Sequence, residues 1–369
     1  MALARLLAVC TLPPWPVRDG YSLRVANVLQ RLAERWDVTL LSPGTAPPGM
    51  RHIGMALDGP GLTYPWRFDN RALAAGISTA LAGQPDRALI WPGAEDAWLR
   101  ARDTPPAVLD MIDCNVLEFW RAARAAGPLR GRIRAVAEAV IALRHGRRAV
   151  RGFAATVCVG GADAAWMSRV GGRAVNSVPN GVDLPELFGL PDARPTILFA
   201  GTLDYGPNID AVAFVAAAIW PHIRAAIPGA RWVIAGRRPV AAIRALHGVD
   251  SVEVRPDVPD MAAEHAAAWV AIAPMRIGVG LKNKVLDAWA SARPVVMTPL
   301  ATNGLTMPRC HDSLVVADAP QFAQVVVSLL RDEPLRRRLG DTARDFVAQE
   351  FAWKRTAADF DRLLREGLA

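Results

Sequence analysis

The first half of the chain alternates short apolar runs with amphipathic stretches. Runs rich in Val, Leu and Ile, bounded by Gly, Pro and Asp, occupy residues 6–12, 37–43, 88–93, 107–113 and 155–160. Between the first two, apolar side chains recur at helical spacing over residues 24–36. Short β runs that alternate with helices predict a parallel sheet with helices on both faces.

The second half repeats this pattern with a different sequence. Strands are predicted at residues 196–203, 231–237, 251–256, 269–274, 293–298 and 313–318, with a long helix at 208–226. A Pro- and Gly-rich stretch without periodicity, residues 180–195, separates the halves, and beyond residue 341 the pattern is only helical. We therefore expect two doubly wound α/β domains, residues 1–180 and 181–350, with ligands at the carboxyl ends of the strands.

One stretch of the second half, residues 273–298 (APMRIGVGLKNKVLDAWASARPVVMT), combines a strand end, a glycine turn and an amphipathic helix. Gly278 and Gly280 permit close approach of a ligand to the backbone, and Gly201 permits the same after residues 196–200. The start of the helix would direct free N–H groups at that place. Lys282 and Lys284 are expected in its first turn, where a cation is unfavourable unless an anion is present.

Composition strengthens the interpretation of this stretch as a phosphate site. Only three of the 43 basic residues are lysines, and two of these stand here; the third is Lys354. An ammonium is a compact point charge that fits against one phosphate oxygen. The alternative is a solvated helix start in which Lys284 pairs with Asp287 at i,i+3.

The overall composition is that of a globular protein. Of 369 residues, 52% are apolar and 21% charged, and no apolar run reaches the roughly 18–20 residues that span a bilayer. The N-terminus is interpreted as a buried first strand rather than a signal peptide, because it has no basic leading region and no clear cleavage site. The four cysteines are scattered, which favours a reducing cytoplasm and no structural zinc.

Positive charge is concentrated in one segment. Between Arg121 and Arg151 there are nine arginines and a single acid, Glu138, interleaved with apolar residues at helical spacing. Such a basic amphipathic helix could lie on an anionic membrane, at the inner face of the plasma membrane, or it could be a core-facing helix with an arginine-rich outer face. No nucleic-acid-binding motif accompanies the charge.

Three further candidates come from loops and strand ends. Gly20 follows the first strand and lets the first helix receive an anion or a sugar, although no GxGxxG is present. Asn208 either binds the donor or caps a helix. Asp110 and Asp113 end a strand on opposite faces, so that only one, Asp113, is expected to face a ligand, unless it caps a helix near Val116. The six histidines show no metal spacing.

Together, the Gly20 loop, PNGVD (179–183), AGTLDYGPN (200–208), RPDVPD (255–260) and GVGLKNKVLDAWASARPVVMT (278–298) resemble family 4 retaining glycosyltransferases, whose fold is GT-B. Within that family, the sequence resembles sugar transferases of bacterial exopolysaccharide clusters, including exosortase-associated ones. The resemblance implies a nucleotide-sugar donor as substrate in the C-terminal domain, a glycan or lipid-linked acceptor in the N-terminal domain, no metal and no cofactor. It also implies that residues 351–369 cross back onto the N-terminal domain.

The resemblance assigns roles to individual residues. Asp287 matches the second acid of an E-x7-E motif and would bind the donor ribose, whereas the first acid is replaced by Val279. The Arg and Lys that usually follow the first strand of the donor domain are replaced by Thr202 and Asn208.

Positive charge then has to come from Lys282 and Lys284, as candidate catalytic residues, and from Arg276. Backbone at residues 278–281, including Leu281, would receive the sugar, and Val258 would flank the base. The expected activity is metal-independent hexosyl transfer with retention. The alternatives are an epimerase of the same fold and a non-catalytic nucleotide-sugar-binding partner.

Overall fold

A computed structural model describes residues 3–56, 70–114, 129–186, 191–278 and 280–366. The chain forms two compact units. Unit 1 comprises Met1–Gly181 together with Trp353–Ala369, and unit 2 comprises Val182–Ala352. The chain thus leaves unit 1 once and returns to it with residues from Trp353 onward.

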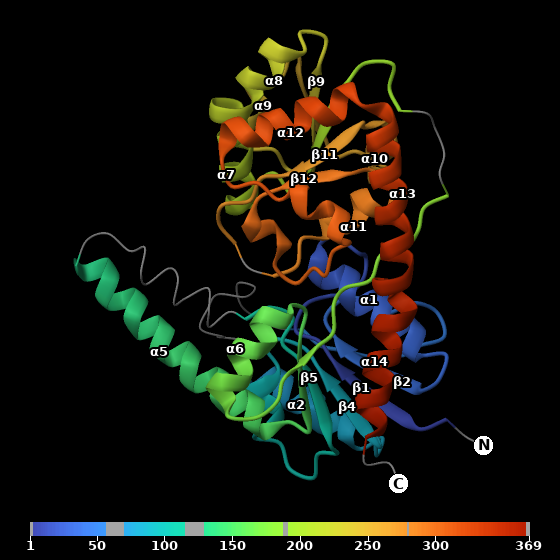
Figure 1. Ribbon diagram of the computed structural model, residues 1–369. Coiled ribbons are helices and arrows are strands. Elements are labelled where there is room, and N and C mark those ends of the chain that lie inside the picture. The colour runs from blue at the N-terminus through green and yellow to red at the C-terminus, as the bar shows by residue number, and fades with distance from the viewer. Residues whose placement is uncertain (1–2, 57–69, 115–128, 187–190, 279, 367–369) are drawn as a thin grey trace. The chain divides into compact units, whose positions relative to one another are not determined.

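Unit 1 contains a seven-stranded parallel sheet with the order β3-β2-β1-β4-β5-β6-β7 (Figure 1). Its strands are β1 Arg5–Val9, β2 Asp37–Ser42, β3 Arg51–Gly54, β4 Arg87–Ile90, β5 Ala107–Asp110, β6 Ala155–Cys158 and β7 Asn176–Ser177. Its helices are α1 Gly20–Leu32, α2 Asn70–Leu81, α3 Glu95–Trp98, α5 Leu129–Gly152, α6 Gly161–Gly171 and α14 Trp353–Arg365. The two edge strands, β3 and β7, were not predicted because both are short and only partly buried.

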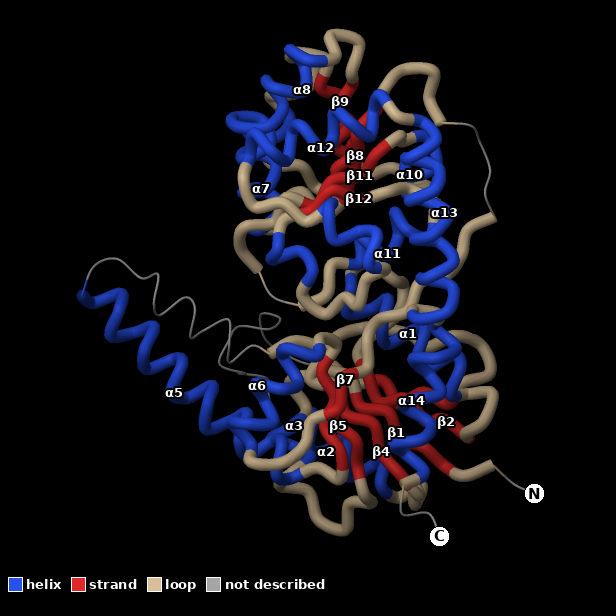
Figure 2. The backbone as a smooth tube through the Cα atoms, in the orientation of Figure 1, coloured by secondary structure: helices blue, strands red, loops and turns tan. Residues whose placement is uncertain are grey.

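Unit 2 contains a five-stranded parallel sheet with the order β10-β9-β8-β11-β12 (Figure 2). Its strands are β8 Thr196–Ala200, β9 Arg231–Gly236, β10 Val252–Pro256, β11 Val270–Ala273 and β12 Val295–Met297. Its α-helices are α7 Gly206–Phe214, α8 Trp220–Ala226, α9 Ala241–Arg244, α10 Met261–Ala267, α11 Asn283–Ala290, α12 Ala319–Arg331 and α13 Glu333–Glu350. Both sheets are parallel and α/β, as predicted.

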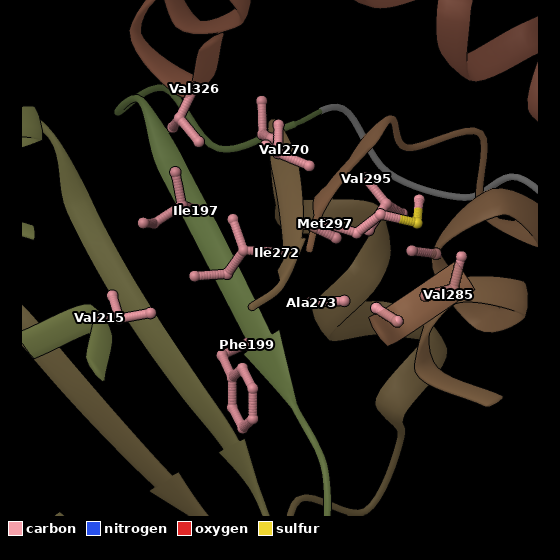
Figure 3. Close-up of a cluster of buried hydrophobic side chains, with 14 of the residues drawn as sticks. Ile197, Phe199, Val215, Val270, Ile272, Ala273, Val285, Val295, Met297 and Val326 are labelled. Atoms are coloured by element: carbon pink, nitrogen blue, oxygen red, sulfur yellow. The ribbon is translucent and has the colours of Figure 1, made fainter. Parts of the chain in front are cut away.

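The core of unit 2 explains why its strands are almost continuously apolar. Ile197, Phe199 and Ile272 on the sheet, and Val285 on α11, are fully or almost fully buried in one cluster (Figure 3). Strands covered by helices on both faces have no solvent-facing positions for polar residues. This packing fixes the carboxyl ends of the strands, and the loops that follow the strands begin there.

The strand predicted at residues 313–318 is wrong. A 3₁₀ helix, Arg309–Leu314, occupies its first part, and only Val315 forms a bridge to Met297 of β12. Beyond it, the side chain of Asp318 accepts a hydrogen bond from the amide of Gln321 and caps α12. The cap ends the extended segment before a ladder can form.

The helix predicted at residues 208–226 is continuous over Gly206–Ala226 but irregular. A π-helical turn, Val215–Ile219, separates α7 from α8, and it lies next to Pro221, which has no N–H to donate. By length and composition alone, this helix could cross a membrane. Its side chains Val212, Val215 and Ile219 pack in the core of unit 2, as those of a core helix do.

A buried ion pair links distant parts of unit 1. Arg24 of α1 donates to Asp110 at the end of β5 over 2.6 Å, and neither side chain is exposed. The same guanidinium donates to Asn180 (2.9 Å) and lies over the ring of Phe360 in α14. Trp91 donates its indole N–H to Asp110 as well. Asp110 therefore has a structural role. Phe360 of α14 packs against the Arg24 side chain of this ion pair.

We expect Asp110→Asn to destabilise unit 1 by about 3–5 kcal/mol, because it leaves the Arg24 charge buried without a counter-charge. Asp113→Asn, a change of the same chemistry at a partly exposed position, is the matched control. Equilibrium urea unfolding of the two variants measures the difference. Equal losses of stability in the two variants would contradict a structural role for the ion pair.

Candidate functional site

The loops after β8 and β9 approach each other closely at the carboxyl edge of the unit 2 sheet. Gly236 has a φ of +154°, and a Cβ placed on it would lie 1.6 Å from the carbonyl oxygen of Gly201. Where these two loops meet, Leu203 also donates its N–H to the carbonyl of Arg237 over 2.8 Å. A side chain at position 236 is therefore excluded, and the contact fixes the backbone at Gly201.

Gly201 provides the space in which two functional side chains meet. A Cβ at this position would lie 2.8 Å from Nδ2 of Asn208 and 3.1 Å from Nζ of Lys284. Three residues predicted from the sequence as parts of a donor site, in the loop after β8, in α7 and in α11, therefore lie together in the structure.

Lys284 is held by an amide, a ring and a sulfur. Its Nζ donates to Oδ1 of Asn208 over 2.7 Å, lies 4.0 Å from the centroid of Phe199 and 3.9 Å from Sδ of Met275. Among the described residues, no ion pair joins this ammonium to a carboxylate. The alternative, an ion pair between Lys284 and Asp287, is therefore wrong.

The environment lowers the pKa of Lys284 to about 7. Burial is the main cause, because it penalises the charged form, and the neighbouring charge of Lys282 adds to it. Lys282 is itself buried, and its Nζ donates to the carbonyl of Gly280 over 2.8 Å. The charge of Lys282 thus acts on the Lys284 ammonium, and a site with these two cations would gain stability from an anion.

The start of α11 lies beside these ammonium groups. The helix begins at Asn283, so Lys282 is the residue before it rather than a member of its first turn, and no side-chain hydrogen bond from Lys282 caps it. Gly278 and Gly280 both have positive φ, +113° and +71°. A helix start with this backbone geometry suits a phosphate group.

Asn208 does not cap a helix, the role that propensity favoured. α7 begins at Gly206, with Tyr205 as its N-cap residue, so Asn208 lies within the first turn. Its amide donates to the carbonyl of Thr202 over 2.8 Å while its oxygen accepts from Lys284. Asn208 therefore positions the Lys284 ammonium against the loop after β8.

Arg276 contributes less positive charge than the sequence suggested. Its guanidinium forms a two-pronged pair with Asp210, at 3.0 and 2.5 Å, and stacks over the ring of Phe214. The partner carboxylate raises the pKa of Arg276 and offsets its charge. Asp210 was not recognised from the sequence, because its approach to Arg276 depends on how α7 packs beside the loop after β11.

The remaining predicted donor-binding residues differ in their surroundings. Asp287 is partly exposed on α11, three residues after Lys284, and burial raises the pKa of its carboxyl to about 7. Leu281 and Val258 are partly buried and pack against apolar clusters. Val279 lies outside the described residues.

The two candidate residues in unit 1, Gly20 and Asp113, are not brought together into one site by any contact among the described residues. Gly20 is the first residue of α1, but the carboxylate of Asp19 already accepts from the amide of Ser22, and the Ser22 hydroxyl accepts from the amide of Asp19. This capping box occupies the place that an incoming anion would take. Asp113 is partly exposed and follows β5, and the helix near Val116 that it was expected to cap lies outside the described residues.

Comparison with known proteins gives the class of this fold. Residues 194–332 match the family model "Glycosyl transferases group 1". Among solved structures, Anabaena Alr3699/HepE in complex with UDP-glucose is similar, with a TM-score of 0.70, 12% identity, and coverage of 98% of this chain and 99% of that one. WaaG, a glycosyltransferase involved in lipopolysaccharide biosynthesis, has a TM-score of 0.66, 15% identity, and coverage of 97% and 99%.

A longer structure is also similar. TarM superimposes with a TM-score of 0.62 at 10% identity over 79% of this chain, which spans 58% of the TarM chain. No curated protein matches the sequence.

The two parallel sheets are those of the GT-B glycosyltransferase fold. The match to the family model, residues 194–332, falls within unit 2.

We expect Lys284→Ala to weaken binding of a nucleoside diphosphate by about 1.5–3 kcal/mol, the value of one hydrogen bond to a charged group. Lys354→Ala, which removes an exposed lysine of α14, is the matched control and should bind as the wild type does. Isothermal titration with UDP and GDP measures both. If the two variants bind equally well, Lys284 does not contact the diphosphate.

The lowered pKa of Lys284 also predicts a pH dependence. A bound diphosphate raises this pKa toward its ordinary value of 10.5, so binding above pH 7 requires uptake of a proton. Affinity should be highest near and below pH 7 and then fall about tenfold per pH unit on the alkaline side. Titrations between pH 7 and 9 test this. The slope should vanish in Lys284→Ala; a slope that persists there would assign it to another group.

Proposed function

We propose that the chain transfers a hexosyl group, with retention, from a nucleoside-diphosphate sugar to a glycan or lipid-linked glycan in the assembly of a cell-envelope polysaccharide or exopolysaccharide. Two similar structures support the proposal: HepE was solved with UDP-glucose, and WaaG acts in lipopolysaccharide biosynthesis. The motifs shared with sugar transferases of exopolysaccharide clusters support the pathway.

The observation that carries the proposal is the Lys284 ammonium beside Lys282. When the bond between the sugar and the diphosphate breaks, negative charge grows on the departing phosphate and positive charge on the sugar ring. Two preorganised ammonium groups and the N–H groups at the start of α11 favour that charge more than they favour the intact donor. This preference for the transition state accelerates the reaction.

The Asp287 carboxylate supports the proposal on the nucleoside side. It lies on the same helix as Lys284, at i,i+3, so a ligand whose phosphates contact Lys284 brings a neighbouring hydroxyl-bearing group toward it. An ionised carboxylate accepts hydrogen bonds from both hydroxyls of a ribose. We therefore assign the ribose to Asp287 and the diphosphate to Lys284.

The acceptor is assigned to unit 1. Asp113 follows β5 at the carboxyl edge of its sheet, where ligands of open parallel sheets bind. Because the capping box of α1 occupies the anion position near Gly20, an uncharged sugar hydroxyl fits this edge better than a phosphate.

The test is incubation with UDP- and GDP-linked hexoses and an acceptor glycan, followed by analysis of the nucleotide and the sugar products. We expect nucleoside diphosphate to be released together with a new α-linked product from an α-linked donor. Lys284→Ala should reduce the rate and Lys354→Ala should not. Isomerisation of the donor sugar would instead identify an epimerase, and binding without turnover a non-catalytic partner.

A further inference from the structure

Helix α2 and the segment of residues 97–103, which begins in α3, enclose a groove in unit 1 that the proposed function does not use. The groove has a volume of about 630 Å³. Sites for small molecules have volumes of roughly 300–1,000 Å³. α2 packs beside α3 (Figure 2), and all the residues that line the groove belong to unit 1. The groove is therefore large enough for a small ligand.

Short side chains explain why the two walls leave a space between them. One wall is a single side of α2, whose lining residues follow one another at intervals of three and four: Arg71, Ala74, Ser78 and Leu81. The other wall is formed by Ala97 of α3 and by residues 100–103. Because Ala74, Ala97 and Ala101 end at a methyl group, they do not fill the space between the walls.

The groove carries an excess of positive charge. Three guanidinium groups, those of Arg71, Arg100 and Arg102, line it together with one carboxylate, that of Asp103, which gives a net formal charge of +2. Arg100, Arg102 and Asp103 are exposed, and none of them forms an ion pair within the part of the chain that the structure describes. The charges of Arg100 and Arg102 are thus available to a ligand.

A second cavity of unit 1, with a volume of about 290 Å³, shows the opposite arrangement. It too is lined by two arginines, Arg5 and Arg51. Arg5 lies 3.9 Å from the carboxylate of Asp86, and Arg51 pairs with Asp37. The fold itself compensates these two guanidinium groups, whereas it leaves Arg100 and Arg102 without a counter-charge. This contrast favours a ligand in the larger groove over a merely solvated basic surface.

The lining residues indicate the chemistry of that ligand. A guanidinium donates two parallel hydrogen bonds to a phosphate or a carboxylate. A phosphate monoester carries a charge of about −1.5 to −2 at pH 7, which matches the net charge of the lining. Asp103 repels a phosphate, but its carboxylate accepts hydrogen bonds from hydroxyl groups, and the hydroxyl of Ser78 both donates and accepts. The groove therefore suits a molecule that has a phosphate at one end and hydroxyl groups elsewhere.

We propose that this groove binds a sugar phosphate. Arg100 and Arg102 hold the phosphate, and Asp103 and Ser78 receive the hydroxyl groups of the sugar. The methyl groups of the three alanines contact the C–H groups of the sugar ring. The inference goes beyond the proposed function, because the groove contains none of the residues to which the donor and the acceptor are assigned.

The experiment is isothermal titration of the full chain with glucose 6-phosphate, glucose, inorganic phosphate and tartrate. We expect saturable binding of glucose 6-phosphate, weaker binding of inorganic phosphate and no binding of glucose, because the charged group supplies most of the affinity. Tartrate has two carboxylates and two hydroxyl groups, so binding of tartrate as tight as that of glucose 6-phosphate would contradict the assignment to a phosphate. Absence of glucose 6-phosphate binding would overturn the proposal.

Charge and space in the groove are tested by separate variants. Arg100→Gln/Arg102→Gln should weaken glucose 6-phosphate binding roughly 100-fold, because two hydrogen bonds between charged groups are lost. Arg309→Gln/Arg338→Gln, which removes two exposed arginines of unit 2, is the matched control. Ala74→Trp should abolish binding without a change of charge, because the indole fills the groove. Its control is Ala75→Trp, at an exposed position of α2 that does not line the groove. Equal losses in the variants and their controls would contradict the proposal.

A further pair of titrations separates this groove from the Lys284 site. Lys284→Ala should bind glucose 6-phosphate as the wild type does, and Arg100→Gln/Arg102→Gln should bind UDP as the wild type does. Loss of glucose 6-phosphate binding in Lys284→Ala would place the sugar phosphate in unit 2 and overturn the proposal for the groove. The proposed function would be unaffected by that result, since it depends on transfer from a nucleotide sugar.

Discussion

The Lys284 ammonium lies in a place where water cannot fully solvate it, and the loops of unit 2 are arranged around that one charge. Phe199 presents its ring, Asn208 its amide oxygen, and the Gly201–Gly236 crossing keeps the neighbouring backbone close. Because these groups stabilise a cation less well than water and a counter-ion do, the pKa of Lys284 falls to about 7. Under the proposed function, a bound diphosphate supplies the counter-charge that Lys284 lacks.

In unit 1, by contrast, the buried charge of Arg24 has a counter-charge. Arg24 and Asp110 are fully buried but paired, and Asn180 and Trp91 form further hydrogen bonds with them. This arrangement fixes α1, β5 and the start of the connection between the units, and α14 covers it with Phe360. The paired charge in unit 1 stabilises the fold, whereas the unpaired charge of Lys284 in unit 2 is the one to which we assign the diphosphate.

The sequence alone was sufficient for the α/β class and the strand periodicity, because strands covered on both faces are read directly as apolar runs. The sequence also predicted that Gly201 and Lys284 belong to one site, because lysine is rare in this chain and glycine permits close backbone approach, and the structure brings these two residues together. It could not reveal that Asp210 compensates Arg276, or that Asn208 holds Lys284, because both depend on packing between elements far apart in sequence. The same limit applies to Asp110, whose partner is 86 residues away.

The scarcity of lysine also provides the most direct test of the central claim. With selective isotope labelling, only Lys282, Lys284 and Lys354 contribute lysine side-chain signals in an NMR spectrum, and Lys284→Arg assigns the relevant one. Its titration should give a pKa near 7 in the free protein and a pKa raised toward the ordinary value when UDP is bound. A Lys284 signal that titrates near 10.5 in both states would contradict the account.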